Sequence, residues 1–240
     1  MFRLKTTCIL VYSLIFNNAI FSQSPVGAWE RYYDDNEGRA VRSVVIFSGK
    51  FQSIAVFDAE SGDFIYSNGG TWKLEGNIMT EIVEFDTADT EKVGQIISFE
   101  VIVEENHLIL PEFGWKFTKI DDGSPGKLNG AWVMSSRLKN GQMKSRDTDK
   151  PRKTMKILSG TRFQWIAFNT ETKEFNGTGG GTYTTKGGKY SEEIEFFSRD
   201  NSKSGLKLVF DYDILDDKWI HKGKTSKGNP LHEIWIKRKN

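Results

Sequence analysis

A tandem repeat constrains the fold of this chain more than any other feature. Residues 163–196 combine aromatic runs, a glycine-rich segment and a run rich in carboxylates, and residues 51–85 carry a diverged copy of them. Identical pairs of residues lie 111 positions apart: Phe64 and Phe175, Gly69 and Gly180, Glu81 and Glu192, and Phe85 and Phe196. Self-similarity at one fixed spacing indicates that a whole structural unit is duplicated. We therefore expect the 240-residue chain to form two similar domains.

Both copies have the pattern of short antiparallel strands. A Gly-Ala-Trp run opens each copy, at residues 27–29 and 130–132, and β-branched or aromatic runs then alternate with turn signals such as Ser48-Gly49-Lys50. Such spacing is typical of an all-β meander. The sequence predicts two tandem antiparallel barrels of about eight strands each, over residues 25–120 and 128–240.

The N-terminal 22 residues have the layout of a secretory signal peptide. Arg3 and Lys5 precede an apolar run at residues 8–16, and small polar residues follow it. Cys8, the single cysteine, stands at the front of this run rather than after it, so we expect no lipoprotein anchor. The mature protein is then expected to be secreted or periplasmic, soluble, without a membrane span and without disulfides.

Charge argues against a nucleic-acid partner. The chain has 33 Lys and Arg residues against 32 Asp and Glu residues, a net charge of +1. A protein that binds nucleic acid through phosphate contacts usually shows a clear basic excess.

The opening tryptophans and the C-terminal half resemble known barrels. In lipocalin-like (calycin) barrels the tryptophan of the opening strand plugs one end, and a basic residue of the last strand packs across it. Trp29 and Trp132 match the tryptophan, and Arg238 or Lys237 matches the basic residue. The pattern of the second copy is also similar to an uncharacterised family of exported bacterial proteins described as lipocalin-like or "membrane or secreted protein". Its matching segments are Phe-x-Trp at 163–165, Gly-Gly-Thr-Tyr at 180–183, Tyr-x-Glu-x-Ile-Glu-Phe at 190–196 and Pro-Leu-x-Glu-Ile-Trp at 230–235. The resemblance implies an exported barrel and implies no activity.

Alternation along the strand at residues 189–197 places a carboxylate among apolar side chains. Tyr190, Glu192, Ile194 and Phe196 fall on one face. A buried carboxylate must be paired, hydrogen-bonded or protonated. Glu192 is therefore either half of an acid–base pair with Tyr190 or a structural residue. In the structural case its partner is expected to be Arg162, Lys153, Arg199 or a tyrosine, and Glu81 takes the same role in the first copy.

Aromatic residues of the second copy suggest a ligand site. The residues predicted to line it are Trp165, Tyr183, Tyr190, Glu192, Phe210 and Tyr212. Aligning Phe51-Gln52 with Phe163-Gln164 puts Ser53 in place of Trp165, and Met79 and Val101 stand in place of Tyr190 and Tyr212. The first copy is accordingly expected to have a closed core. The same aromatic side chains could instead simply fill the second barrel.

Other residue types predict no metal site and no cofactor. His107, His221 and His232 lack the close spacing of a metal motif. Gly179–Gly181 precedes a β-type run, so a strand bulge explains it better than a phosphate loop.

Three functional classes remain after the motifs are weighed. The first is a non-enzymatic module that binds a small apolar or amphipathic ligand or a protein partner, and this is the class that we favour. The others are an enzyme with an interior Tyr/Glu acid–base site in the second barrel and a purely structural envelope protein.

The signal peptide generates a direct prediction. N-terminal sequencing of the protein purified from the envelope or medium of its host should find a mature chain that begins near residue 23, because cleavage is expected close to Ser22. Recovery of intact Met1 from the cytoplasm would contradict it.

Overall fold

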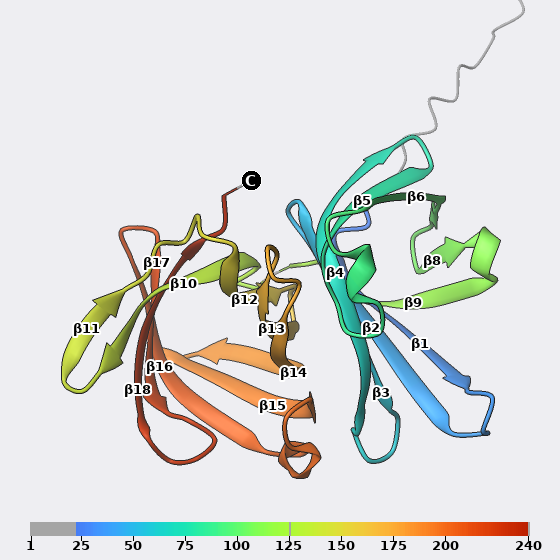
Figure 1. Cartoon of the computed structure of the whole chain (residues 1–240). Coiled ribbons are helices and arrows are strands. Elements are labelled where there is room, and N and C mark those ends of the chain that lie inside the picture. Colours follow the sequence, from blue (N-terminus) through green and yellow to red (C-terminus); the bar gives the residue numbers. More distant parts are fainter. Residues whose placement is uncertain (1–22, 125, 240) are drawn as a thin grey trace, which may run out of the picture.

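The protein consists of two antiparallel β-barrels that lie side by side (Figure 1). The structure is a computed structural model that describes residues 23–124 and 126–239, so the expected signal peptide lies outside the described residues. The predicted fold class, all-β with two antiparallel meander barrels, is confirmed.

Each barrel is built from nine strands. The first contains β1 (Gly27–Asp34), β2 (Ala40–Ser48), β3 (Phe51–Asp58), β4 (Phe64–Glu75), β5 (Ile78–Asp86), β6 (Ile96–Glu100), β7 (Ile102–Val103), β8 (His107–Leu110) and β9 (Trp115–Asp121). The second contains β10 (Gly130–Lys139), β11 (Gln142–Ser145), β12 (Arg152–Leu158), β13 (Arg162–Asn169), β14 (Phe175–Lys186), β15 (Lys189–Phe197), β16 (Lys207–Leu215), β17 (Lys218–Lys224) and β18 (Pro230–Lys237). Short 3₁₀ turns occur at η1 (Thr90–Lys92), η2 (Pro111–Phe113) and η3 (Asn201–Lys203).

The two barrels close in different ways. In the second, β10 pairs with both β12 and β18, which completes a ring of eight strands, and β11 folds back on the end of β10 as an additional hairpin. In the first, β6 pairs with β5 and β7 pairs with β8, and only Val101 separates β6 from β7. The first ring is therefore nearly closed, and the chain itself bridges its last gap.

Strand register corrects the alignment of the two copies. Gln52 pairs with Gly70 in the β3–β4 ladder, and Phe163 pairs with Gly181 in the equivalent β13–β14 ladder. Because Gly70 and Gly181 are 111 residues apart, Gln52 corresponds to Phe163. The alignment of Gln52 with Gln164 is wrong by one residue. A slip of one residue exchanges the two faces of a strand, so it also misassigns which side chains enter the barrel.

A glycine bulge occurs at the same place in each barrel. Gly181 pairs with Ile194 while the preceding Gly180 pairs with Phe196, which leaves Glu195 as the extra residue. A Cβ atom on Gly181 would lie 1.9 Å from the carbonyl oxygen of Glu193, so only glycine fits there. The predicted bulge in the glycine run is confirmed. It also turns Phe196 away from the barrel interior, which corrects the expectation that Phe196 shares a face with Ile194.

The two barrels pack through the outer faces of equivalent strands. Two buried clusters combine residues of both barrels, drawn mainly from β2, β3 and β5 and from β10, β12, β13 and β15. Phe57 stacks on Phe196 with ring centroids 4.9 Å apart, and Phe85 packs against Phe168 at 5.2 Å. Phe57 and Phe168 occupy equivalent positions, as do Phe85 and Phe196. Interchanging the two barrels would therefore turn each of these contacts into the other.

Contact between equivalent residues marks a pseudo-twofold axis. Phe64 and Phe175, identical members of the repeat, stack on each other with centroids 6.3 Å apart. A surface that meets its own copy in this way is isologous, as in a twofold-symmetric dimer. The chain is thus built like a homodimer whose two subunits have been joined.

Partly buried ion pairs cross the same interface. Arg42 donates to Glu195 at 2.9 Å, and Arg162 donates to the same carboxylate at 2.7 Å. Burial alone would raise the pKa of Glu195, but the two guanidiniums hold it below its ordinary value. On the other side of the axis Arg238 donates to Glu84 at 2.7 Å. The bulge glutamate of each barrel therefore receives an arginine from the opposite barrel.

This placement of Arg238 differs from the expectation that it packs across the opening tryptophan. The ammonium of Lys237 takes that position, 4.2 Å from the centroid of Trp132, and Lys119 lies 4.9 Å from the centroid of Trp29. Neighbouring residues of a strand point to opposite faces, so Lys237 and Arg238 cannot both face the indole. Trp29 and Trp132 are themselves buried, at 0% and 2% exposure.

The interface predicts a large effect of a single truncation. Phe196→Ala should lower the free energy of unfolding by about 3–5 kcal/mol, because the ring is 2% exposed and packs on the opposite barrel. Chemical denaturation measures the effect. Val209→Ala, at a position that is 59% exposed, serves as control and should change stability by less than about 0.5 kcal/mol. Equal stability of the two variants would contradict the role of the interface.

Candidate functional site

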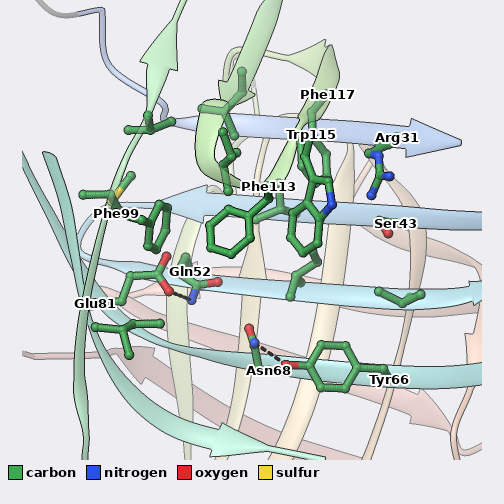
Figure 2. Close-up of a pocket in the computed structure, with 18 of the residues that line it drawn as sticks. Arg31, Ser43, Gln52, Tyr66, Asn68, Glu81, Phe99, Phe113, Trp115 and Phe117 are labelled. Carbon is green, nitrogen blue, oxygen red and sulfur yellow. Dashed lines mark hydrogen bonds between the residues drawn. The ribbon is translucent and has the colours of Figure 1, made fainter. Parts of the chain in front are cut away.

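The first barrel encloses a cavity of about 430 Å³ with mainly apolar walls (Figure 2). Its inner wall includes Ile54, Met79, Val101, Leu108 and Phe117. The expectation of a closed core in this barrel is therefore wrong. The smaller side chains that stand in place of aromatic residues of the second barrel line this cavity.

Strand register identifies the replacements. Ile54, not Ser53, stands in place of Trp165. Ile54 pairs with Val45 and Trp165 pairs with Lys156, and these two partners lie 111 residues apart, the spacing of the repeat. Met79 and Val101 stand in place of Tyr190 and Tyr212, as the sequence indicates.

Two carboxyl groups line this cavity. Asp86 accepts a hydrogen bond of 3.0 Å from the hydroxyl of Tyr66, and Glu81 lies among the apolar side chains. Glu81 is 8% exposed, and its Oε2 accepts a hydrogen bond of 3.0 Å from the side-chain amide of Gln52, which is 3% exposed (Figure 2). Burial raises the pKa of Glu81 to about 7, and the hydrogen bond from Gln52 opposes this shift. Near neutral pH the carboxyl group is therefore partly protonated, and able to donate a hydrogen bond, and partly ionised, and able only to accept one.

Aromatic side chains from the β8–β9 connection reach the same cavity. Phe113 of η2 lies between Phe99 and Trp115, with ring centroids 6.1 Å and 5.0 Å away, and it is 49% exposed (Figure 2). Arg31 places its guanidinium 5.2 Å from the centroid of Trp115. An exposed aromatic side chain at the edge of an apolar cavity is available to cover a bound molecule.

The second barrel contains a cavity of about 410 Å³ with a different lining. Of the six side chains predicted to line a site there, Trp165, Glu192 and Phe210 do so. Tyr190 is fully buried in the core instead. The hydroxyl of Tyr183 donates to the carbonyl of Ser159 at 2.6 Å, and Tyr212 packs against the core from its partly buried position.

Glu192 is held by a lysine that the sequence analysis did not identify. Lys156 of β12 donates to Glu192 at 2.6 Å, and both side chains are nearly inaccessible, at 7% and 5% exposure. The expected partners Arg162, Lys153 and Arg199 bind elsewhere. Five aromatic rings surround the ammonium, with centroids 4.9–5.9 Å away: Phe163, Tyr190, Phe210, Trp219 and Trp235. Cation–π attraction helps to compensate the lost hydration of Lys156.

A histidine and a second glutamate extend this polar group. His221 pairs with Glu233 in the β17–β18 ladder, with Nδ1 3.7 Å from the carboxylate, which is beyond hydrogen-bond distance. Burial and the nearby Lys156 lower the pKa of His221, so the ring is neutral at pH 7. His232 instead lies opposite Lys222. Across residues 23–124 and 126–239, no group of three or more metal-ligating side chains occurs.

Tyr190 and Glu192 are neighbours in the barrel interior, but only Glu192 lines the cavity where a substrate would meet an acid–base pair. The hydroxyl of Tyr190 does not line the cavity, and burial together with the charge of Glu192 raises its pKa well above 10. Glu192 is already bound to Lys156. In this structure the carboxylate therefore stabilises the barrel interior.

Comparison with known proteins identifies only the second barrel. Residues 127–240 match a protein family described as a domain of unknown function (DUF4488). No curated protein matches the chain. Within the described part of the chain, no helix is long and apolar enough to cross a membrane.

The two interior carboxylates are expected to respond oppositely to replacement. The ordinary pKa of Glu81 is 4.5 and its folded value is about 7, so its contribution to stability is full below pH 4.5 and is lost as the pH rises through 7. Glu81→Gln removes this loss. As the pH rises from 4 to 9, the unfolding free energy of the variant minus that of the wild type should therefore increase by about 3 kcal/mol.

Glu192→Gln should instead lose about 3 kcal/mol at pH 7, because it leaves the buried ammonium of Lys156 unpaired. Denaturation curves across this pH range measure both effects. A parallel response of the two variants would show that the carboxylates have the same environment.

Proposed function

We propose that the chain is an exported, lipocalin-like binding protein whose first barrel holds a small apolar molecule that carries one hydrogen-bonding group. The observation that carries this proposal is the mainly apolar cavity of about 430 Å³ whose wall holds the hydrogen-bonded pair of Glu81 and Gln52, while Asp86, which also lines the cavity, already accepts a hydrogen bond from Tyr66. The segments at residues 25–120 and 128–240 are proposed as the two structural units, and the secreted or periplasmic location rests on the N-terminal sequence.

The size and lining of the cavity support this proposal. Small-molecule sites typically measure about 300–1,000 Å³ and combine apolar walls with a few placed polar groups. The apolar walls would supply most of the binding free energy through burial of the ligand, at about 25 cal/mol per Å². The polar pair would orient the ligand, since a buried polar group must find a partner.

The protonation behaviour of Glu81 narrows the ligand class. A carboxyl group with a pKa of about 7 can donate to a carbonyl or accept from a hydroxyl group. A ligand that carries a carboxylate would place two negative charges together at this position. We therefore propose a neutral ligand with a hydroxyl or carbonyl group, and Phe113 and Trp115 would contact its outer end.

The test fills the first cavity with a side chain that the second barrel already accommodates. Ile54→Trp introduces the residue found at the equivalent position, Trp165, and should weaken binding of the neutral dye Nile red at least tenfold. Fluorescence titration measures binding, and a denaturation curve confirms that the variant is folded. Glu81→Gln should abolish any change in dye affinity between pH 6 and pH 8.

Two controls accompany this test. Trp165→Ile makes the reciprocal change in the second barrel and should leave Nile red binding within about twofold of the wild type. If Ile54→Trp folds normally and binds the dye as tightly as the wild type does, the first barrel is not the site and the proposal is wrong.

A further inference from the structure

The lining of the second cavity is strongly basic. Six cationic side chains line it: Arg137, Arg146, Arg152, Lys156, Arg199 and Lys203. The carboxylates that line it are Glu192 and Glu233. The first cavity, in contrast, has Arg31 and Lys92 against Glu81 and Asp86. The two cavities therefore differ in the charge of their linings although they have nearly the same volume.

Both carboxylates of the second cavity already have cationic neighbours. Glu192 binds Lys156 at 2.6 Å, and Glu233 lies 3.5 Å from Arg137. Of the other four cations, Lys203 lies 3.7 Å from Asp200. Over the described residues Arg146, Arg152 and Arg199 have no carboxylate oxygen within 4.0 Å, and they donate to neutral partners, Arg146 to Thr154 and the other two to Asn176. Burial, and to a smaller extent the positive charges of Arg152 and Arg137, lower the pKa of Arg146, because each disfavours the charged form of its side chain. An anion between these cations would stabilise that charged form.

The three arginines belong to the second copy alone. Arg152 and Arg199 stand 111 residues after Val41 and Ala88, so neither has a cationic counterpart in the first barrel. Arg146 follows β11, in a hairpin that the first barrel lacks. The basic character was therefore acquired, or kept, by one barrel and is not a consequence of the shared fold.

The cavity also offers apolar contacts and unsatisfied polar atoms. Its apolar walls are formed by Trp165, Phe197, Leu206, Leu208, Phe210 and Trp235. His221 lines the cavity, is 2% exposed, and has no hydrogen-bond partner at either ring nitrogen among the residues described. Buried polar atoms are nearly always satisfied in folded proteins. A ligand with a polar group at its inner end would satisfy His221.

We infer that the second barrel binds a small amphipathic organic anion, with its carboxylate or phosphate group at Arg146, Arg152 and Arg199. Its apolar body would lie against Trp165 and Phe210, and a hydrogen-bonding atom would reach His221. Arginine suits this role because its planar fork of N–H donors matches both anions. This site is independent of the first cavity, which the neutral ligand of the proposed function would occupy.

The experiment uses anilinonaphthalene sulfonate, an anionic fluorophore, as the probe in the full chain. The Ile54→Trp variant serves as background, so that binding reports the second barrel. Decanoate, decyl phosphate and 1-decanol then compete for the site. The two anions should displace the probe at concentrations at least tenfold lower than decanol, and the better of the two identifies the preferred head group.

Substitution of the basic residues completes the test. The double variant Arg146→Ala/Arg152→Ala should bind the probe at least tenfold more weakly, and its affinity should depend less on salt concentration. Arg31→Ala, which removes a cation from the first cavity, is the matched control and should leave probe binding unchanged. Displacement by decanol as effective as displacement by decanoate, or unchanged affinity in the double variant, would overturn the inference. Loss of Nile red binding in the first barrel would not affect this result.

Discussion

The packing of one barrel against the other is the constraint on which the rest of the structure depends. Strands β2, β3, β12 and β13 are buried on both faces, because one face lines a barrel and the other lies in the interface. Sheets packed face to face need apolar outer surfaces that would otherwise face water. This requirement accounts for some of the residues that are identical in the two copies. Phe64 and Phe175 meet on the pseudo-twofold axis, and Glu84 and Glu195 each receive an arginine from the opposite barrel.

Because the interface uses outer faces, the interiors were free to diverge. Register places Val45 at the position of Lys156, Met79 at that of Tyr190 and Leu110 at that of His221. The two copies therefore keep a common shell around different chemical contents. Duplication of a binding barrel followed by divergence of its interior would yield two cavities with distinct ligand classes in one chain.

Much of the fold could be predicted from the sequence, and less of the site. The constant spacing of identical residues and the short strand runs were enough to predict two meander barrels. Site prediction failed where the interface disturbs strand alternation. In β12, Met155 and Ile157 are fully buried but belong to the interface, so the intervening Lys156 points into the barrel. Alternation alone suggests the opposite, since apolar residues usually mark the interior face. Two identical Phe-Gln pairs also displaced the alignment of β3 and β13 by one residue.

Glu81 and Glu192, the same residue of the repeat in its two copies, show how one inherited residue acquires two roles. Glu81 and Glu192 occupy equivalent positions in the same kind of strand, so their local backbone does not distinguish them. What differs is the residue across the barrel. Lys156 supplies a charge that keeps Glu192 in a structural ion pair, whereas the side-chain amide of Gln52 leaves Glu81 with a pKa near 7. A carboxylate bound to an ammonium has little freedom to contact a ligand. A carboxyl group beside an amide keeps a donor or acceptor available, and it does so in the barrel whose cavity has mainly apolar walls.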